Sequence, residues 1–412
     1  MSRQCTFVVS ELYYPELTST GLYMTGIAEA LASRFAVFVL CSQPTYSSRG
    51  ERARTDEVRA GVSIHRCWST TFSKDMLVSR VVNMLTFSVS VLFAGLRRFR
   101  KGDVALVVTN PPVLPFMVAL AAAVRGARIV LKIDDMYPDV LVATGFASST
   151  GLLARLLVWV STRLLLRCEK VVVCGRDMAE KVRVRLGGGT PRPPVVVITN
   201  WADVDVVRAL PKGRSRLWPD LDLEGKFVVL HAGNLGRAQD LETVLRAAHA
   251  LAAEEDIVFL MIGSGGREAW LAGEIRDRGL RNVILEGPMP RDRQPEFLSV
   301  GDVALTVLVP GMLGVSVPSR LYNYLAAGRP VIAVGDRGSE VCLTVEEERV
   351  GWFVQAADWQ GLADTVRRAK DNPAAVLEMG RRARRVAETR FSREAVLGQY
   401  QVLMDSVVRD TA

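Results

Sequence analysis

Short apolar runs that alternate with helix-like stretches recur twice along this chain of 412 residues, and this alternation limits the fold more than any other feature. Strands buried on both faces read as continuous apolar runs, and helices between them allow parallel connections. The sequence therefore predicts two α/β domains, each a doubly wound parallel sheet. The predicted strands are 5–10, 37–41, 62–66, 104–109, 129–133, 171–174 and 195–199, then 227–231, 257–262, 283–285 and 303–307.

A stretch rich in proline, glycine and charge, residues 204–225, separates the two sets of runs and is interpreted as a linker. It would join a first domain over 1–203 to a second over 226–391. A last helix is predicted over 392–410, and it could pack back on the first domain. A chain of this length exceeds one comfortable hydrophobic core, in agreement with two domains.

The charge balance favours anionic partners, because 52 Lys and Arg residues stand against 44 Asp and Glu residues and give a net charge of +8. Such a balance suits anionic lipid, phosphorylated ligands or nucleic acid. We expect no nucleic acid partner, since the chain lacks the basic motifs with interleaved aromatic residues that bind RNA or single strands.

The cysteines and histidines give no sign of a zinc site. Six cysteines are scattered mostly through apolar runs without a CxxC pair, and the three histidines lie far apart in sequence. Such cysteines are typical of buried thiols in a reducing compartment. Because the first run lacks the long apolar core of a signal peptide, we expect a cytoplasmic protein.

An apolar helix is predicted over 76–96 and is followed by a basic cluster at 97–101. Its charge-free part, 83–96, is too short to cross a bilayer. The helix is either a core helix with a solvated end or an interfacial helix that holds anionic headgroups. Further apolar segments at 113–124 and 152–167 favour a peripheral position on the inner face of the plasma membrane.

Polar clusters follow three strands of the first half, at 110–112, 134–139 and 200–203. Ligands of doubly wound sheets bind beyond the carboxyl ends of the strands. Asp134 and Asp135 could therefore serve as a base, a sugar-hydroxyl acceptor or a metal ligand, or could merely cap the following turn. The small-residue loop that ends at Gly21 also allows close approach of a ligand, although no GxGxxG dinucleotide fingerprint is present.

Glycine-rich strand ends in the second half favour a diphosphate site. Residues 231–240 and 263–267 each combine glycines with an arginine, Arg237 and Arg267 respectively, and backbone amides with a guanidinium suit a diphosphate. A third turn lies in 314–333, where a helix is predicted to begin at Pro318 and to stop near Gly328. Its free amides and Arg320 would face a phosphate, unless this is an ordinary αβ unit.

Taken together, these motifs resemble the retaining glycosyltransferases of family 4, which have the GT-B architecture of two Rossmann-like domains facing across a cleft. The resemblance covers nearly the whole chain and is strongest to the bacterial branch labelled fucosamine transferases of surface-polysaccharide assembly. It rests on 13–15 with Gly21, 135–138, 200–203, 233–236, 263–265, Gly287 and above all 317–332.

The resemblance implies metal-independent transfer of a sugar, with retention, from a nucleotide diphosphate donor, with UDP expected, to a lipid-linked glycan, and it implies no cofactor. The implied catalytic residues are Asp135 on the acceptor side and Arg237 and Arg320 at the leaving diphosphate. The implied donor-binding residues are Gly21, Gly233, Asn234, Gly236, Gly263, Gly265, Val315, Ser316, Ser319, Tyr322 and Asn323.

The chain departs from the family pattern at four positions. The usual pair of glutamates eight residues apart falls on Val315 and Asn323, and the usual Arg and Lys fall on Asn234 and Gln239. Donor-sugar hydroxyls would then meet amides near Val315, and Arg237 and Arg320 would supply the missing charge. The DxD-like sequences at 203–205 and 220–222 are discounted as metal sites because they lie in or beside the predicted linker.

Three other functions remain open from the sequence. The acceptor could be a soluble natural product in place of a lipid-linked glycan. The chain could be a nucleotide-sugar 2-epimerase of the same architecture, although few cleft carboxylates are available for it. It could also be a non-catalytic two-lobed sugar-binding protein, a class that is normally exported.

Overall fold

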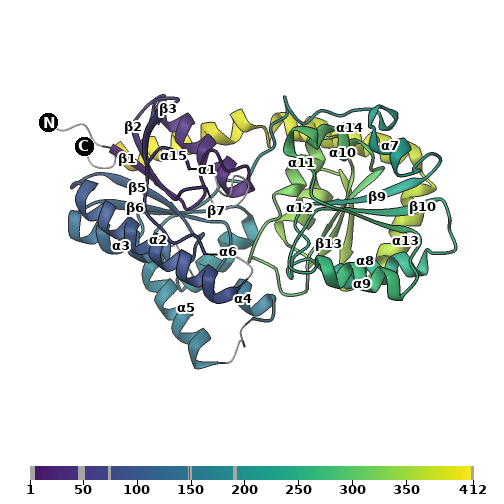
Figure 1. Ribbon diagram of the computed structural model, residues 1–412, viewed down its shortest axis with the longest axis horizontal. Helices are drawn as coiled ribbons and strands as arrows, with labels where there is room; N and C mark the ends of the chain where they lie inside the picture. Colours follow the sequence, from purple (N-terminus) through teal and green to yellow (C-terminus); the bar gives the residue numbers. More distant parts are fainter. Residues whose placement is uncertain are drawn as a thin grey trace. The chain divides into compact units, whose positions relative to one another are not determined.

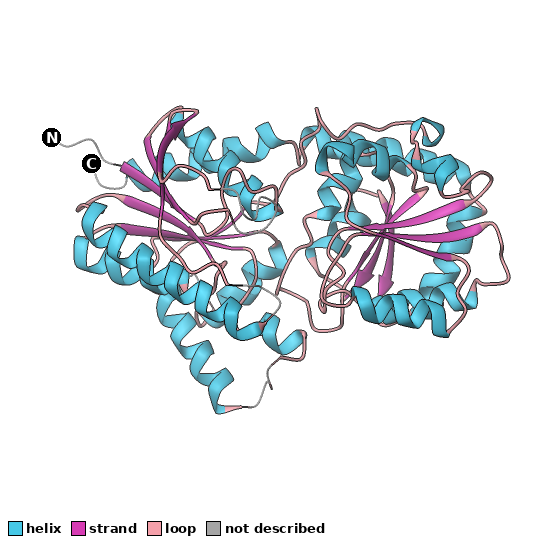
Figure 2. Ribbon diagram, viewed as in Figure 1, coloured by secondary structure: helices cyan, strands magenta, loops and turns pink. Residues whose placement is uncertain are grey.

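The computed structural model describes residues 5–44, 52–72, 76–146, 148, 151–188 and 193–409. The chain divides into two compact units (Figure 1). The first comprises Met1–Pro138, Ser148–Thr199 and Val396–Ala412, and the second comprises Asp139–Ala147 and Asn200–Ala395. Each unit is a sheet covered by helices (Figure 2).

The first unit contains an eight-stranded sheet in the order β3-β4-β2-β1-β5-β6-β7-β8. All neighbours are parallel except β3 and β4, which form an antiparallel pair. The central strand β5 is buried at every position, as expected for a strand with helices on both faces. The strands are β1 (Cys5–Val9), β2 (Ala36–Cys41), β3 (Asp56–Arg59), β4 (Val62–Arg66), β5 (Val104–Val108), β6 (Arg128–Ile133), β7 (Lys170–Val173) and β8 (Val195–Val197).

Helices cover both faces of this sheet, with α2, α3 and α5 on one face and α1 and α15 on the other (Figure 1). Helix α1 begins after Thr18, whose hydroxyl accepts a hydrogen bond from the Gly21 N–H and so caps the first turn. The helices are α1 (Ser19–Ala32), α2 (Leu77–Arg98), α3 (Leu114–Arg125), α5 (Leu152–Leu165), α6 (Arg176–Arg185) and α15 (Arg393–Arg409).

Helix α2 packs on α3, and its Phe87 and Val91 are buried. Asn83 is also buried and holds the chain that follows β4, because it accepts a hydrogen bond from the Thr70 hydroxyl and donates one to the Phe72 carbonyl. Among the described residues, this is the one helix whose length and composition would allow a membrane crossing, and only 33% of its apolar window is buried. A core helix that packs by one side passes the same test.

The last helix, α15, packs on the first unit from Val396 onward. Gln401 donates to the Ala30 carbonyl at 2.9 Å, and Asp405 pairs with Arg34 at 2.6 Å. Further along, Lys170 of β7 donates to the Ser406 hydroxyl at 2.6 Å. The helix therefore supplies one wall of the core of this unit.

The second unit contains a six-stranded, fully parallel sheet in the order β11-β10-β9-β12-β13-β14. A continuous apolar core lies between this sheet and helices α8, α9 and α13, whose leucines face the strands. The strands are β9 (Phe227–Ala232), β10 (Ile257–Ile262), β11 (Val283–Glu286), β12 (Val303–Val307), β13 (Val331–Gly335) and β14 (Gly351–Gln355). The helices are α4 (Asp139–Ala143), α7 (Leu217–Asp220), α8 (Leu241–Ala250), α9 (Glu268–Asp277), α10 (Gln294–Ser299), α11 (Arg320–Ala326), α12 (Glu340–Glu347), α13 (Trp359–Lys370) and α14 (Pro373–Thr389), with short 3-10 turns at Lys212–Arg214 and Arg291–Arg293.

The segment expected to be a linker, 204–225, is packed on the second unit. Arg384 of α14 donates to the carbonyls of Val204, at 2.9 Å, and of Val207 and Ala326, at 2.6 and 2.7 Å. Arg329 donates to the Leu210 carbonyl at 2.6 Å. Arginines that satisfy buried carbonyls therefore hold this segment, which composition alone did not indicate. The unit comprises Asn200–Ala395, where the sequence predicted a domain over 226–391, and it also includes Asp139–Ala147.

We expect Arg384→Ala to lower the free energy of unfolding of the second unit by about 2–4 kcal/mol, because it leaves three carbonyls without their charged donor. Arg381 lies on the same helix, is exposed and makes only a 3.9 Å pair with Glu378, so Arg381→Ala is the matched control. It should cost under about 0.5 kcal/mol. Urea unfolding of both variants checks this, and equal midpoints would contradict it.

Candidate functional site

Two loops of the second unit, which follow β9 and β10, are joined to each other by their backbones. The Gly233 N–H donates to the Ile262 carbonyl at 2.8 Å, and the Leu235 N–H donates to the Ser264 carbonyl at 2.9 Å. Both loops lie at the carboxyl end of the sheet, where doubly wound folds bind ligands. The four predicted glycines of this half, Gly233, Gly236, Gly263 and Gly265, all lie in these two loops.

The glycines are required by this loop packing. Gly263 has a φ of +146°, and a Cβ built there would lie 2.0 Å from the Gly233 carbonyl oxygen. A Cβ on Gly265 would lie 2.5 Å from the Leu235 carbonyl. Only glycine allows such a close approach of two backbones. Part of the glycine pattern that predicted a diphosphate site therefore has a purely structural cause.

Arg320, the first residue of α11, lies directly over the loop that follows β9. Its guanidinium hydrogen-bonds the His231 Nε2 and donates to the Asn234 carbonyl at 3.1 Å. A Cβ on Gly233 would lie only 3.2 Å from the Arg320 Cζ. The predicted residues Gly233, Asn234 and Arg320 are thus brought together.

His231 is fully buried at the end of β9. Burial, and then the neighbouring Arg320 charge, hold the pKa of His231 well below its usual value. The ring is therefore neutral, and a neutral imidazole nitrogen can accept a hydrogen bond from a guanidinium. His231 fixes Arg320 without cancelling its positive charge, which a carboxylate partner would do.

Tyr324 joins α11 to the same strand end. Its hydroxyl accepts a hydrogen bond from the Ala232 N–H at 2.7 Å and donates to the Ala232 carbonyl at 3.2 Å. Tyr324 lies one turn after Arg320, so both side chains leave the same face of the helix. The helix orientation and the position of the guanidinium are thereby fixed together.

Helix α11 is shorter than the sequence suggests. It begins at Arg320, not at Pro318, although Ser319 already has helical φ and ψ values of −63° and −19°. The Ser319 side chain makes no capping hydrogen bond, and the helix spans only seven residues. Because each turn adds to the helix dipole, so short a helix gives less support to a phosphate than the expected longer one.

Val315 does not offer the amide that the sequence suggested. Its side chain is fully buried in a small apolar cluster with Leu308 and Met312. Its N–H already donates to the Met312 carbonyl at 3.0 Å. A donor sugar would therefore have to bind other groups in this turn, where Ser316 is partly buried.

Three amide side chains in this unit carry a buried oxygen with no hydrogen-bond partner among the described residues: the Oδ1 of Asn282, the Oδ1 of Asn323 and the Oε1 of Gln239. Asn282 and Asn323 are 8% exposed, and Gln239 is 6% exposed. Buried acceptors of this kind normally have a donor. Asn323 and Gln239 lie at two of the positions where the chain departs from the family pattern.

Tyr322 and Arg237 have surroundings other than those expected. The Tyr322 ring is 1% exposed and packs edge-on against Phe391, with centroids 5.1 Å apart. Arg237 is exposed, and its Cζ lies 5.0 Å from the centre of the Phe146 ring. Stacking on an aromatic face leaves the edge of a guanidinium able to donate hydrogen bonds.

In the first unit, Asp134 and Asp135 differ in their roles. The Asp134 carboxylate pairs with the buried Lys132 and accepts from the Cys174 thiol at 3.5 Å. Burial opposes the charge on Lys132, but Asp134 outweighs it and holds the pKa of Lys132 well above its usual value. Asp134 is therefore a structural anion. Tyr400 of α15 is fully buried beside this pair.

Thr109 positions the backbone of both aspartates. Its hydroxyl accepts from the Asp134 N–H at 3.2 Å and donates to the Asp135 carbonyl at 3.3 Å. Asp135 thereby lies at the end of β6 with its backbone held. Gly21, also in this unit, uses its own N–H to complete the Thr18 cap, at 3.2 Å, so this amide is engaged.

The sequence pointed to Arg320 but not to the residues that hold it or to those around Asp135: His231, Tyr324, Lys132 and Thr109. The polar His231 and Lys132 interrupt otherwise apolar strand runs, and that interruption is the signal that could have found them. Within the described ranges, no group of three or more His, Cys, Asp and Glu residues could hold a metal ion.

Comparison with known families divides the chain as the two sheets do. Residues 20–201 match the family described as "Glycosyl transferase 4-like domain", and residues 219–386 match "Glycosyl transferases group 1".

Individual proteins give the same result. The chain is 30% identical to "Probable glycosyltransferase WbjE" of Pseudomonas aeruginosa, over 87% of each chain. It is 28% identical to "Putative colanic acid biosynthesis glycosyl transferase WcaI" of Escherichia coli (strain K12), over 94% of this chain and 96% of the relative. The solved structure of Anabaena HepE with UDP-glucose superposes with a TM-score of 0.73 at 16% identity, over 98% of this chain and 99% of HepE. The fold is thus GT-B, and the chain belongs to the glycosyltransferases that combine a 4-like domain with a group 1 domain.

Proposed function

We propose that this protein transfers a sugar, with retention, from a nucleotide diphosphate donor to a lipid-linked glycan in bacterial polysaccharide biosynthesis. The donor is UDP-linked and the sugar is an N-acetylated deoxyhexosamine. The observation that carries the proposal is the Arg320 guanidinium, held over Gly233 by a neutral histidine at the carboxyl end of a parallel sheet. We place the transfer reaction in the cytoplasm, at the inner face of the plasma membrane.

Two relatives support the donor and the setting of this proposal. WcaI is named for colanic acid biosynthesis, and HepE was crystallised with UDP-glucose. The chain as a whole resembles the fucosamine-transferase branch most, and that resemblance is the basis for the deoxyhexosamine. A soluble natural product as acceptor is the second candidate, and the exposed apolar surface of the first unit favours the lipid.

Loss of the nucleotide diphosphate is the main electrostatic problem of the reaction, because breaking the bond to the anomeric carbon adds one negative charge to an already anionic diphosphate as the sugar becomes oxocarbenium-like. A fixed cation stabilises that charge without reorganisation. Arg320 supplies it, since its histidine partner leaves the guanidinium charge intact. Arg237, in the loop that follows β9, adds a second cation, so the proposal requires no metal ion and no cofactor.

The donor's hydroxyl groups supply the hydrogen-bond donors that two buried oxygens lack. Asn323 follows Arg320 by three residues, so the two side chains share one face of α11. We assign the Asn323 Oδ1 to a ribose or sugar hydroxyl and the Gln239 Oε1 to another polar group of the donor. Neutral amides replace the charged residues usual at both positions.

Asp135 acts on the acceptor. The neighbouring Asp134 is paired with Lys132, and we assign Asp135, the next residue, to the incoming hydroxyl. It hydrogen-bonds or deprotonates that hydroxyl as the bond to the anomeric carbon forms.

Arg320→Ala should lower kcat/KM by an amount that corresponds to a loss of about 2–4 kcal/mol of transition-state stabilisation, because the charge on the leaving diphosphate loses its fixed cation. The measurement is acceptor-dependent release of UDP from a panel of UDP-N-acetylhexosamines with lipid-linked glycans. Arg337→Ala is the control, since Arg337 is 70% exposed, pairs with Glu346 at 3.7 Å and lies with its Cζ 4.5 Å from the centre of the Phe353 ring. A wild-type rate in Arg320→Ala would place the phosphate elsewhere.

Epimer formation from the donor alone would favour the epimerase, and donor binding without any turnover would favour the sugar-binding protein.

His231 should make stability depend on pH. The pKa of His231 is depressed in the folded protein, so at low pH the unfolded chain binds a proton there that the folded chain does not. The contribution of His231 to the free energy of unfolding is therefore fully present above about pH 6.5 and is lost as the pH falls below it. His231→Asn keeps a neutral acceptor but cannot titrate. The free energy of unfolding of wild type relative to this variant should fall by about 1 kcal/mol between pH 6.5 and 5.5. Urea unfolding at each pH measures it, and a constant difference would refute the assignment.

Asp135→Asn should lower kcat/KM by about 100- to 10,000-fold while donor affinity is unchanged, because an amide cannot take the acceptor proton. Asp205→Asn is the control, since Asp205 is exposed and belongs to a DxD-like sequence outside the strand ends. Initial rates and UDP titrations separate the two effects. Equal losses in both variants would remove Asp135 from the reaction.

A further inference from the structure

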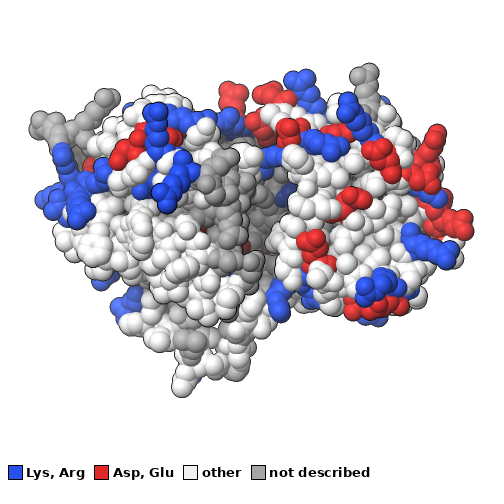
Figure 3. All heavy atoms as spheres, in the orientation of Figure 1, with Lys and Arg blue, Asp and Glu red and all other residues white. Residues whose placement is uncertain are grey.

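Helix α2 carries an exposed apolar stripe along one face. Its members recur every three or four residues, which places them on one side of the helix. Their exposures run from 44% to 69%. They are Val78, Val81, Leu85, Val89 and Phe93. Figure 3 shows a broad surface without charged side chains over α2 and α5, with basic side chains at its edge. Contiguous exposed apolar surface of this kind marks an interaction site.

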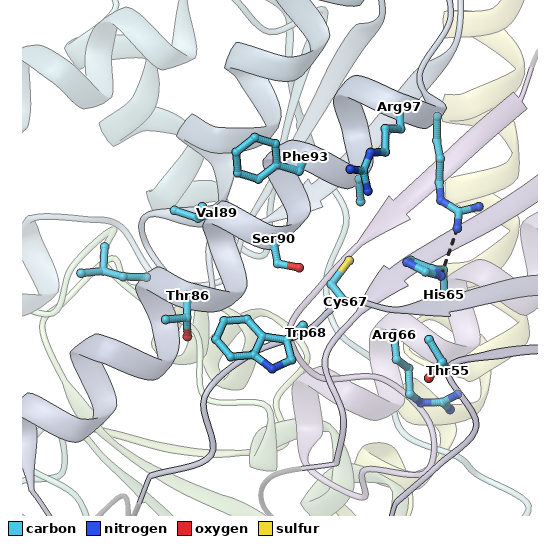
Figure 4. A pocket seen from close by; sticks show the side chains of 13 residues that line it. Thr55, His65, Arg66, Cys67, Trp68, Thr86, Val89, Ser90, Phe93 and Arg97 are labelled. Carbon is cyan, nitrogen blue, oxygen red and sulfur yellow. Dashed lines mark hydrogen bonds between the residues drawn. The ribbon is translucent and has the colours of Figure 1, made fainter.

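Part of the stripe forms the wall of a groove of about 760 Å³, within the range of small-molecule sites. Figure 4 shows Val89 and Phe93 along α2, with Trp68, from the chain that follows β4, facing Ser90 and Thr86. Trp68 is 67% exposed. The groove is therefore a hollow between a helix and a loop with an aromatic ring on each side.

Several polar groups in the groove already have partners. The Thr86 hydroxyl donates to the Val82 carbonyl at 2.9 Å, Ser90 hydrogen-bonds Cys67, and the Arg66 Nη2 donates to the Tyr14 carbonyl at 2.9 Å. The Arg66 Nε is buried without a hydrogen-bond partner among the described residues. Burial raises the pKa of Cys67 to about 12, so its thiol is neutral and unreactive. An apolar occupant would break none of the hydrogen bonds that these groups make.

One end of the groove is basic. Arg98 hydrogen-bonds His65 at 3.0 Å and lies 3.9 Å from Asp56, so its charge is partly compensated. Arg97, beyond Phe93 in Figure 4, has no ion-pair partner within the described part of the chain. Arg100 and Lys101 follow and are exposed. The groove thus joins an apolar trough to an anion-binding end.

We propose that this groove binds the polyprenyl chain of the lipid-linked acceptor, with the phosphate of that lipid against Arg97. An apolar hollow with an unpaired cation at one end matches a long isoprenoid tail with an anionic head. A flat bilayer surface would use the exposed stripe but would not fill the hollow. The inference deepens the proposed function, since it rests on an acceptor that is lipid-linked.

The test measures binding of undecaprenyl phosphate to the full-length protein in phosphatidylcholine nanodiscs, without any turnover. Ser90→Trp fills the groove and leaves the stripe and the charges in place. It should weaken binding by about tenfold or more, because the chain loses its contacts with the walls. Val78→Trp adds the same bulk to the same helix outside the groove lining and should bind as wild type does.

Two further arms separate the sources of affinity. Arg97→Gln should weaken binding of undecaprenyl phosphate but not of undecaprenol, which has no phosphate. Adsorption to phosphatidylglycerol vesicles should be unchanged in Ser90→Trp. If Ser90→Trp and Val78→Trp bind undecaprenyl phosphate equally, or if phosphatidylglycerol competes fully for the groove, the surface is a bilayer contact and the inference is overturned.

Folding and function are controlled independently. UDP affinity and thermal unfolding report whether Ser90→Trp is folded, and if it is not, Val89→Gln, at a position 44% exposed, must show the same loss of lipid binding. Groove binding without transfer to any lipid-linked glycan would refute the acceptor and leave the groove intact. Transfer to such a glycan that is equally efficient in Ser90→Trp would refute the groove alone.

Discussion

The hydrogen bond between Arg320 and His231 is the interaction on which the proposed chemistry of the second unit depends. A cation is useful at a leaving diphosphate only if it is held still and keeps its charge. A buried carboxylate would hold the guanidinium but cancel its positive charge, whereas a buried neutral imidazole holds the guanidinium and leaves that charge intact. Tyr324 fixes the same helix one turn later, so the guanidinium is positioned by the fold before any ligand arrives.

The alternation of apolar runs predicted both sheets, because strands with helices on both faces must be apolar along their whole length. The site was only partly predictable. Gly233, Asn234 and Arg320 come together as expected, and Asp135 follows a buried strand. Val315 could not be interpreted from sequence, since whether its N–H is free depends on a turn at Met312. That the segment 204–225 packs on the second unit could not be interpreted from sequence, because the side chains that donate to its carbonyls are distant in sequence: Arg384 is 177 residues from Val207, and Arg329 is 119 residues from Leu210.

A glycine pattern can have two causes that composition cannot separate: close packing of two backbones, or an amide left open to a ligand. In the loops after β9 and β10 the first cause applies, because the glycines allow two backbones to touch and the Gly233 and Gly263 N–H groups already donate to the Ile262 and Glu286 carbonyls. A glycine in the sequence shows that the position has no side chain, but not which of these causes required it. Polar residues within buried strands were the more specific signal, since each of them, His231 and Lys132, holds a neighbouring charged group in place.

The last helix also decides how this protein can be divided. Tyr400 closes over Lys132, and Val396, Met404 and Val407 are buried with it, so fourteen residues near the end of the chain, 396–409, complete a core that begins at β1. A fragment cut after Thr199 would expose a charged lysine and an apolar sheet face at once. An independently folding N-terminal domain therefore needs this C-terminal segment joined to it. The first unit is built from segments at both ends of the chain, with the second unit between them in sequence.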